Sequence, residues 1–290
     1  MIVITGATGA LNGTTVDHLL ERVPAGQIGV SVRDVAQAQR FADRGVRVRR
    51  GSYDDPAALL DSFEGADQVL LVSPNDPHAD QPAQLRVAVE TAVKAGARRI
   101  LYTSHQHIGP DSPFLPARHH AAAEAVLADS GVAWTSLRNG FYAHSLDWLL
   151  GPWAETGEIA APADGPVSWT ERAEEGEAAA VILADQESGR RSFDGPVTLT
   201  ARATPTFAAV AAIASELTGR DIRRAVMDDD DWVAAQVAHG SPEPMARMLL
   251  GFFQAARAGR FAETSPLLGE LLGREPRTVR DLLADRVAAS

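Results

Sequence analysis

Short apolar runs alternate with amphipathic stretches through the first half of the chain. The apolar runs predict strands at residues 2–5, 27–32, 46–49, 68–73, 99–103 and 132–137. The stretches between them predict helices at residues 15–22, 35–43, 83–95 and 119–129, and one that begins at Asp55-Pro56 with the aspartate as N-cap. The run QVLLVS at 68–73 has an unbroken apolar centre, as in a strand buried on both faces. This alternation predicts an α/β fold with a doubly wound parallel sheet.

The pattern changes after residue 151. Helical patterns follow at 174–184, 205–218, 229–238, 243–258 and 277–288, with a strand-like run at 197–200. We therefore expect a main domain at residues 1–150 and a smaller, mostly helical region at 151–290 that packs over the carboxyl edge of the sheet. The strand near 197 and a helix could return to the main sheet, so the two parts need not be separable.

Composition narrows the class of protein. The 290 residues are 45% hydrophobic and 22% charged, as in an ordinary globular protein, and they include no cysteine. The formal net charge of −11 disfavours binding to nucleic acid. No stretch approaches the ~18 apolar residues of a membrane span, and the chain opens on a strand rather than a secretion signal. We expect a cytoplasmic protein with a small-molecule substrate and no nucleic-acid or membrane partner. A homodimer is compatible with the sequence.

A glycine-rich turn joins the first predicted strand to the first helix. Gly6 permits a tight turn, and Gly9 allows the backbone to approach a pyrophosphate bound at the helix N-terminus. The third position of the G-x-x-G-x-x-G pattern holds Asn12, and Gly13 follows it. We expect Asn12 either to shift the helix slightly or to adopt an unusual backbone dihedral. The position of this turn predicts a loop that binds NAD(P).

Arg33 comes directly after the second predicted strand. An acidic residue there binds the ribose hydroxyl of NAD, whereas arginine suits the 2′-phosphate of NADP. Asp34 complicates this interpretation, although it could equally cap the helix that follows. The alternative is a surface arginine without a ligand. The sequence favours NADP(H) over NAD(H).

Five motifs follow one another in a characteristic order and spacing. They are TGATGAL at 5–11, VRD at 32–34, LLVSP at 70–74, ILYTS at 100–104 and LRNGFY at 137–142. Together they resemble the NmrA-like branch of the atypical short-chain dehydrogenases, and within it the type 2 NAD(P)H:quinone oxidoreductases. The resemblance implies a Rossmann domain, a small C-terminal domain, and a substrate cleft over the nicotinamide.

The resemblance also assigns residues to the cofactor and the substrate. The phosphate loop comprises Gly6, Thr8, Gly9, Ala10, Leu11 and Asn12, and the 2′-phosphate position is Arg33. The remaining cofactor positions are Ser52 and Tyr53 beside the adenine, Val72, Ser73 and Pro74 beside the ribose and nicotinamide, and Thr103 and Ser104 at the end of the fifth strand. The substrate cleft is bordered by Asn139, Gly140, Phe141 and Tyr142. The family commonly has aspartate at the position of Ser52.

The tyrosines cannot support the usual chemistry of short-chain dehydrogenases. That chemistry needs a Tyr-x-x-x-Lys pair, but neither Tyr53, Tyr102 nor Tyr142 has a lysine four residues later, and Lys94 is the only lysine. Hydride transfer to a quinone is less demanding, because the product oxyanion is stable and positioning suffices. These features favour an NADPH-dependent reductase of a quinone or a similar conjugated carbonyl.

His120 and Tyr142 are the candidate catalytic residues. His120 matches the family's histidine, is predicted in the first turn of the helix at 119–129, and could donate to a substrate carbonyl. The alternative is a solvated histidine beside His119. Tyr142 would help to shape the acceptor site, although clustered aromatic residues are more often part of a core.

Other polar and aromatic groups carry weaker signals. His105 and His107 suggest a metal pair, but no further ligands complete a site, so we expect no metal. Trp148 and Trp153 could stack against a flat substrate or belong to the core. The acidic run Asp228–Asp231 is explained by a solvated helix N-terminus.

Two alternatives to a quinone reductase remain open. The first is a non-catalytic NmrA-like regulator that senses NADP and binds a protein partner. The second is a tailoring reductase or isomerase that acts on an aromatic or polyketide-like metabolite. The absence of the tyrosine–lysine pair fits the regulator equally well.

Overall fold

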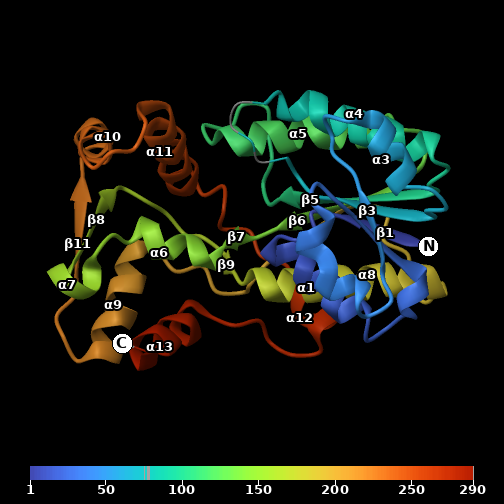
Figure 1. Ribbon diagram of the computed structural model, residues 1–290. Helices are drawn as coiled ribbons and strands as arrows, with labels where there is room; N and C mark the ends of the chain where they lie inside the picture. Colours follow the sequence, from blue (N-terminus) through green and yellow to red (C-terminus); the bar gives the residue numbers. More distant parts are fainter. Residues whose placement is uncertain (75, 77–78, 290) are drawn as a thin grey trace.

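A seven-stranded parallel sheet organises the first of two lobes (Figure 1). The computed structural model describes residues 1–74, 76 and 79–289. The strand order is β10-β6-β5-β4-β1-β2-β3. The strands are β1 (Ile2–Thr5), β2 (Ile28–Val32), β3 (Arg47–Arg50), β4 (Gln68–Leu71), β5 (Arg99–His105), β6 (Ala133–Asn139) and β10 (Gly195–Leu199). The predicted doubly wound sheet is confirmed, and the strand near 197 does return to it.

Helices cover both faces of this sheet, so every residue of β1, β2 and β4 is buried. One face carries α3 (Pro56–Ser62), α4 (Gln81–Lys94) and α5 (Leu115–Ala128). The other carries α1 (Ala10–Leu19), α2 (Gln39–Ala42), α8 (Arg172–Ser188) and α12 (Leu267–Leu272). The short 3₁₀ turns are η1 (Ala25–Gln27), η2 (Val35–Ala38) and η3 (Ala143–Ser145). The helix predicted at 35–43 is therefore one 3₁₀ turn followed by one α turn.

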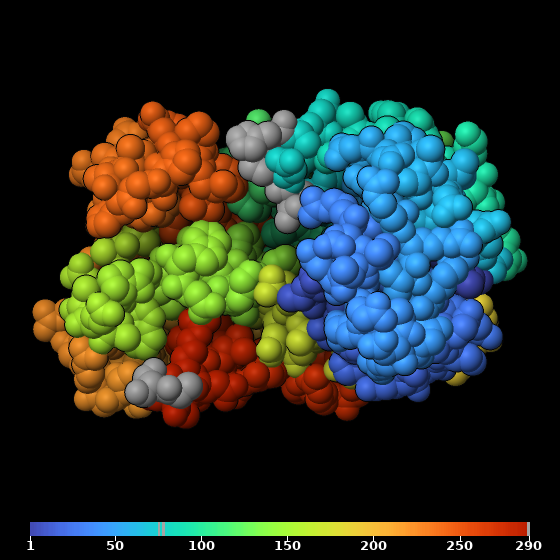
Figure 2. Space-filling model, viewed as in Figure 1, coloured from blue at the N-terminus to red at the C-terminus, as the bar shows by residue number. Residues whose placement is uncertain are grey.

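The second lobe is built mostly from helices, as predicted. They are α6 (Leu146–Leu149), α7 (Trp153–Thr156), α9 (Phe207–Thr218), α10 (Asp229–Ala238), α11 (Glu243–Arg257) and α13 (Val279–Ala289). Two short parallel ladders accompany them, β8 (Glu158–Pro162) with β11 (Arg223–Met227) and β7 (Phe141–Tyr142) with β9 (Trp169–Thr170). Asp228 caps α10 by accepting hydrogen bonds from the next turn, which explains the acidic run. Figure 2 shows the two lobes side by side.

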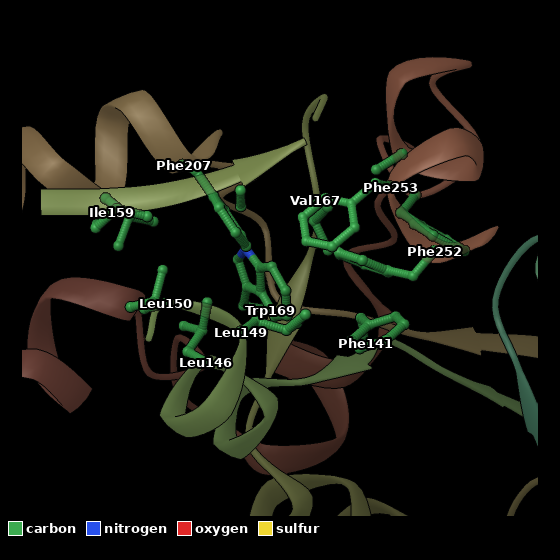
Figure 3. Close-up of a cluster of buried hydrophobic side chains, with 14 of the residues drawn as sticks. Phe141, Leu146, Leu149, Leu150, Ile159, Val167, Trp169, Phe207, Phe252 and Phe253 are labelled. Atoms are coloured by element: carbon green, nitrogen blue, oxygen red, sulfur yellow. The ribbon is translucent and has the colours of Figure 1, made fainter. Parts of the chain in front are cut away.

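An aromatic core holds the second lobe together (Figure 3). The rings of Phe141 and Phe252 lie 4.5 Å apart, and those of Trp169 and Phe252 lie 5.7 Å apart. Trp153 is 8% exposed and belongs to this core, whereas Trp148 is 48% exposed. The predicted aromatic cluster is therefore divided between the core and the surface.

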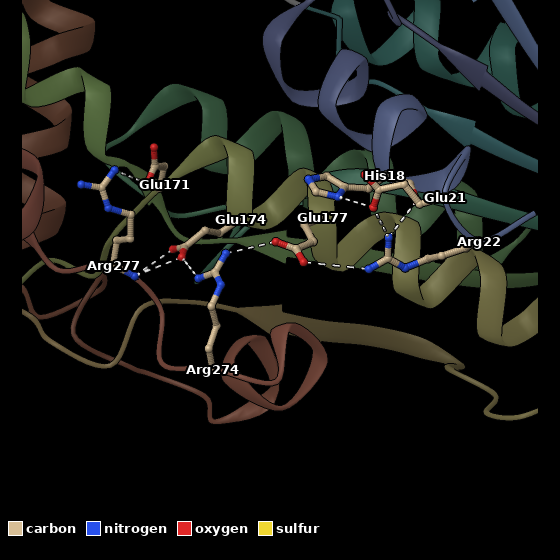
Figure 4. Close-up of polar contacts among 8 residues, drawn as sticks. All are labelled: His18, Glu21, Arg22, Glu171, Glu174, Glu177, Arg274 and Arg277. Carbon is tan, nitrogen blue, oxygen red and sulfur yellow. Dashed lines mark hydrogen bonds and ion pairs between the residues drawn. The ribbon is translucent and has the colours of Figure 1, made fainter. Parts of the chain in front are cut away.

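An ion-pair chain along α8 joins the two lobes (Figure 4). Glu174, which is 2% exposed, pairs with Arg274 and accepts a 3.0 Å hydrogen bond from the backbone N–H of Arg277. Glu177 pairs with Arg274 at 3.1 Å and with Arg22, in the turn that follows α1, at 3.9 Å. These contacts fix α8 between the phosphate-loop helix and the C-terminal segment.

Within the described residues, no helix is long and apolar enough to cross a membrane.

Candidate active site

The predicted phosphate loop lies where the strand order reverses, between β1 and β4. Ligands of doubly wound folds bind at this switch point. Gly6 has a φ of +65°, and a Cβ there would lie 2.7 Å from Cγ1 of Val72 at the end of β4. Gly9 is the N-cap of α1 and places no side chain over the helix end. Thr8, Gly9 and Ala10 are exposed, so the free N–H groups of the first turn can meet a pyrophosphate.

Asn12 replaces the third glycine without disturbing α1. It lies inside the helix with 1% of its surface exposed, and its amide Nδ2 donates a 2.8 Å hydrogen bond to the carbonyl of Thr5. The expected unusual dihedral is therefore wrong, because Asn12 lies within α1 without a positive φ and its side chain braces the helix against β1. A slight shift of the helix stays a prediction. Close packing occurs instead at Gly13 and Gly176, where a Cβ would lie 3.0 Å from Ala7 O and 2.7 Å from Leu11 O, respectively.

Arg33 extends from the end of β2 into solvent. It is exposed, and it makes no ion pair with any described residue. The carboxylate of Asp34 accepts a 3.0 Å hydrogen bond from the N–H of Ala36 and caps the following turn. Of the two readings of Asp34, the structure shows the cap. The Arg33 guanidinium thus remains available for a phosphate, which stays a prediction.

Tyr53 joins the ends of β1 and β4. Its hydroxyl lies 2.8 Å from Oγ1 of Thr5 and donates a 2.9 Å hydrogen bond to the carbonyl of Val72. Burial raises the pKa of Tyr53 well above its usual value, so the phenol stays protonated. The Ser52 hydroxyl accepts a hydrogen bond from the N–H of Asp54 within the same turn. Both residues lie at the predicted edge of the site, and their polar atoms already have protein partners.

The ends of β4 and β5 are linked by buried hydroxyl groups. Oγ1 of Thr103 accepts a 2.9 Å hydrogen bond from the N–H of Ser73. Ser104 donates a 2.9 Å hydrogen bond to Glu124 of α5, which also pairs with Arg138 at 2.6 Å. This pairing raises the pKa of Arg138. Thr103 and Ser104 thus brace the strand ends, and their contact with a cofactor stays a prediction. Pro74 is half-buried.

His120 faces Tyr102 of β5. Its Nδ1 lies 2.8 Å from the Tyr102 hydroxyl. The helix α5 begins at Leu115, so His120 lies in the second turn and the prediction of a first-turn position is wrong. Burial lowers the pKa of His120 from 6.5 to about 3, with a smaller effect from His105. Burial likewise raises the pKa of Tyr102, so both groups are neutral at physiological pH.

His105 lies between this pair and the aromatic core. Its ring centroid is 6.1 Å from that of His120, and its Nδ1 donates a 2.7 Å hydrogen bond to the carbonyl of Gln106. Burial lowers the pKa of His105 to about 4. His107 is exposed, and no cluster of metal-ligating side chains occurs among the described residues.

The predicted substrate-cleft residues at 139–142 point in two directions. Phe141 faces the aromatic core, whereas Tyr142 faces α8, with the Arg172 guanidinium 5.8 Å from its ring centre. Burial raises the pKa of Tyr142, with a further contribution from Glu175. Within the described residues, no hydrogen bond or ring contact joins Tyr142 to His120. The two predicted catalytic residues are therefore not in direct contact.

Glu175 is a buried carboxyl group that the sequence did not bring to attention. It is 1% exposed, and neither of its oxygens has a hydrogen-bond partner in the described part of the chain. Burial raises its pKa well above the usual value. Asn139, another predicted cleft residue, has a buried Oδ1 that likewise lacks a partner among the described residues.

Two residues beside the site were not predicted to contribute to it. For Tyr102 the sequence shows only that no lysine follows four residues later, as the usual catalytic pair would require. In the sequence, Glu175 looks like one of several exposed acidic residues on α8. The signal for Tyr102 was its place in the ILYTS motif, one residue before Thr103. No sequence signal distinguished Glu175 from Glu174.

The chain is similar to known proteins over almost its whole length. Residues 6–147 match a family described as NAD(P)H-binding. Quinone oxidoreductase 2 of Escherichia coli is 32% identical, with 97% of this chain and 96% of the relative covered. The NmrA-like oxidoreductase flvB of Aspergillus flavus is 29% identical over 96% of this chain and 92% of its own.

Solved structures of NADP(H)-binding reductases superpose on the whole chain. The E. coli NADPH-dependent quinone oxidoreductase, complexed with NADPH, superposes with a TM-score of 0.89 and covers 100% of this chain and 99% of its own at 32% identity. The triphenylmethane reductase of Citrobacter sp., complexed with NADP(H), gives 0.87 at 30% identity, with 99% of this chain and 100% of its own covered. The chain therefore belongs to the NAD(P)H-binding oxidoreductases of the NmrA-like type.

Proposed function

We propose that this protein is an NADPH-dependent reductase of quinones or similar conjugated carbonyls. The observation that carries the proposal is the neutral Tyr102–His120 pair beside the dinucleotide switch point. The relatives support it, since they include a quinone oxidoreductase and a dye reductase. The alternative of a non-catalytic regulator is disfavoured by this similarity to reductases.

The phosphate loop and Arg33 would hold the cofactor. The uncapped first turn of α1 and the close approach of Gly6 to Val72 fit a pyrophosphate. The unpaired Arg33 guanidinium fits a 2′-phosphate, which favours NADPH over NADH. NADPH supplies the hydride when it is bound.

His120 would stabilise the acceptor as a hydrogen-bond donor. We assign the O–H of Tyr102, which keeps its proton because burial raises its pKa, as the donor to Nδ1 of His120. The imidazole proton then lies on Nε2, where it can donate to an acceptor oxygen that gains negative charge. Since the ring stays neutral, the proton that completes the hydroquinone comes from solvent.

Cofactor consumption by the purified protein tests the proposal directly. NADPH and NADH oxidation is followed at the nicotinamide absorbance with and without a panel of quinones. Quinone-dependent oxidation that is faster with NADPH is the expected result. Tight NADP binding with no turnover of any acceptor would instead favour the regulator. Inert quinones together with an active aromatic metabolite would favour a tailoring enzyme.

A further inference from the structure

An apolar groove lies where α5, α6, β7 and α11 meet. Its volume is about 360 Å³, and every side chain that lines it within the described part of the chain is apolar or aromatic. The lining residues are Phe114, Pro116, Phe141, Trp148, Met245, Met248 and Leu249. Pockets that hold small molecules span about 300–1,000 Å³, so the groove is large enough for part of a ligand.

The groove leaves large apolar side chains in water. Trp148 is 48% exposed and Met245 is 39% exposed, whereas Trp169 in the neighbouring core is 1% exposed. Such exposure forgoes the free energy that burial of apolar surface supplies, and it marks a surface that a ligand can cover. Methionine is unbranched and flexible, which suits a wall that adapts to its ligand.

The groove lies close to the proposed acceptor site. The rings of Phe114 and Phe141 lie 5.9 Å and 5.4 Å from the ring of His105. His105 in turn lies 6.1 Å from His120. Because burial lowers the pKa of both histidines far below neutrality, neither ring carries a charge beside the groove. An acceptor held at His120 would therefore have an uncharged aromatic wall between its ring and the groove, two ring contacts away.

We propose that the apolar groove binds an uncharged, lipophilic substituent of the acceptor, such as an alkyl or isoprenoid chain on a quinone ring. The inference rests on the proposed reductase function, since it takes the acceptor carbonyl to lie at His120. An anionic substituent does not fit, because the lining residues that the structure describes offer no charged or polar side chain to replace its lost hydration. The acceptor class is therefore a lipophilic quinone or conjugated carbonyl.

The kinetic test uses a series of benzoquinones with the same ring substitution and alkyl chains of increasing length. The value of kcat/KM for the wild-type protein is expected to rise by about two- to fourfold for each methylene that enters the groove. Met248→Ser and Trp148→Ser should flatten this dependence, and Met248→Leu should restore it. Val226→Ser is the control, since Val226 lies on β11 and is 67% exposed outside the groove. Chain length without effect in the wild-type protein would overturn the proposal.

A binding test separates this inference from the reductase proposal. Unreactive 4-alkylphenols are titrated into the NADP-saturated protein by calorimetry, so that turnover is not needed. The Kd should fall with chain length in the wild-type protein and in Val226→Ser, but not in Met248→Ser. Analytical ultracentrifugation of the wild-type protein and of Trp148→Ser measures the oligomeric state of each. A dimer that the variant abolishes, with no effect of chain length, would overturn the proposal and assign the groove to a contact between copies.

Discussion

The hydroxyl of Tyr102 lies 2.8 Å from Nδ1 of His120, and burial shifts the pKa values of the two groups in opposite directions. The phenol therefore retains its proton and the imidazole remains neutral. Tyr102 comes from β5 and His120 from α5, so the packing of the helix on the sheet creates the pair. In the proposed reductase, Tyr102 acts through His120 as a positioning residue.

Tyr102→Phe should lower kcat by about tenfold or more while KM changes little, because the imidazole loses the partner that fixes its tautomer. The nitrogen chemical shifts of His120 should report a mixture of tautomers in the variant. Combining it with His120→Ala should cause no further loss in kcat. Additive losses in the double variant would show that Tyr102 acts independently of His120. His119→Gln is the matched control, because His119 contacts Gln81 rather than Tyr102.

The pH dependence of kcat/KM should lack a histidine inflection. An ordinary histidine titrates near 6.5, whereas the pKa of His120 is lowered to about 3 by burial. The ring is therefore neutral throughout the range from about pH 5 to about pH 8, and its donor proton is not lost there. A steady-state pH profile with quinone measures this. A loss of activity centred near the ordinary histidine pKa would contradict the neutral-donor role.

Arg33→Ala should raise the Kd for NADPH by about tenfold or more and leave that for NADH nearly unchanged. The reason is that only NADPH carries the 2′-phosphate that the unpaired guanidinium can bind. Titration with both cofactors provides the measurement. Arg98→Ala is the control. This arginine is 81% exposed and directly precedes β5, so it lies at the amino ends of the strands, whereas Arg33 follows the carboxyl end of β2. Equal effects of Arg33→Ala on both cofactors would exclude the 2′-phosphate assignment.

The sequence predicted the sheet well because buried parallel strands leave an unbroken apolar signal. The run at Gln68–Leu71 is the clearest case, and the Gly6 turn was placed correctly after β1. The start of α5 was missed because its N-cap, Phe114, makes no side-chain hydrogen bond. Strands β8 and β11 were missed because EIAAP and RRAVM lack clear alternation of apolar and polar residues.

Contacts within the site were harder to predict than its location. Tyr102 and His120 are 18 residues apart, and only the packing of α5 on β5 brings them together. Neighbouring acids on α8 also differ in ways that residue type does not reveal. Glu174 is paired with Arg274, whereas the buried carboxylate oxygens of Glu175 have no hydrogen-bond partner among the described residues.

Gly6→Ala should destabilise the protein more than Gly65→Ala does. Both glycines have similar positive φ values, +65° and +71°, so both variants incur the same backbone strain of about 1–2 kcal/mol. A Cβ at Gly65 meets nothing within 4 Å, but at Gly6 it lies 2.7 Å from Val72. The clash should add about 1–3 kcal/mol and weaken NADPH binding in Gly6→Ala alone. Thermal denaturation and cofactor titration check this, and equal behaviour of the two variants would contradict the close approach of Gly6 to Val72.

Glu175→Gln should stabilise the protein at alkaline pH. The folded state raises the pKa of Glu175 above the unfolded value, so it holds a proton that the unfolded chain releases. Wild-type stability from this group is therefore complete below the unfolded pKa and decreases as pH rises towards the folded pKa. Glutamine does not titrate, so the variant should escape that loss and gain about 2 °C or more in Tm at about pH 8.

Glu174→Gln is the matched control for this effect. Glu174 is as deeply buried but holds Arg274 and the N–H of Arg277, so its neutralisation should lower Tm at about pH 8. Thermal denaturation of both variants at about pH 5 and about pH 8 makes the comparison. The advantage of Glu175→Gln should shrink at the lower pH, because about pH 5 lies close to the unfolded pKa, where the unfolded wild-type chain still holds part of this proton and releases less of it on unfolding. An advantage of equal size at both pH values would mean that packing, rather than the buried charge, distinguishes Glu175 from Gln.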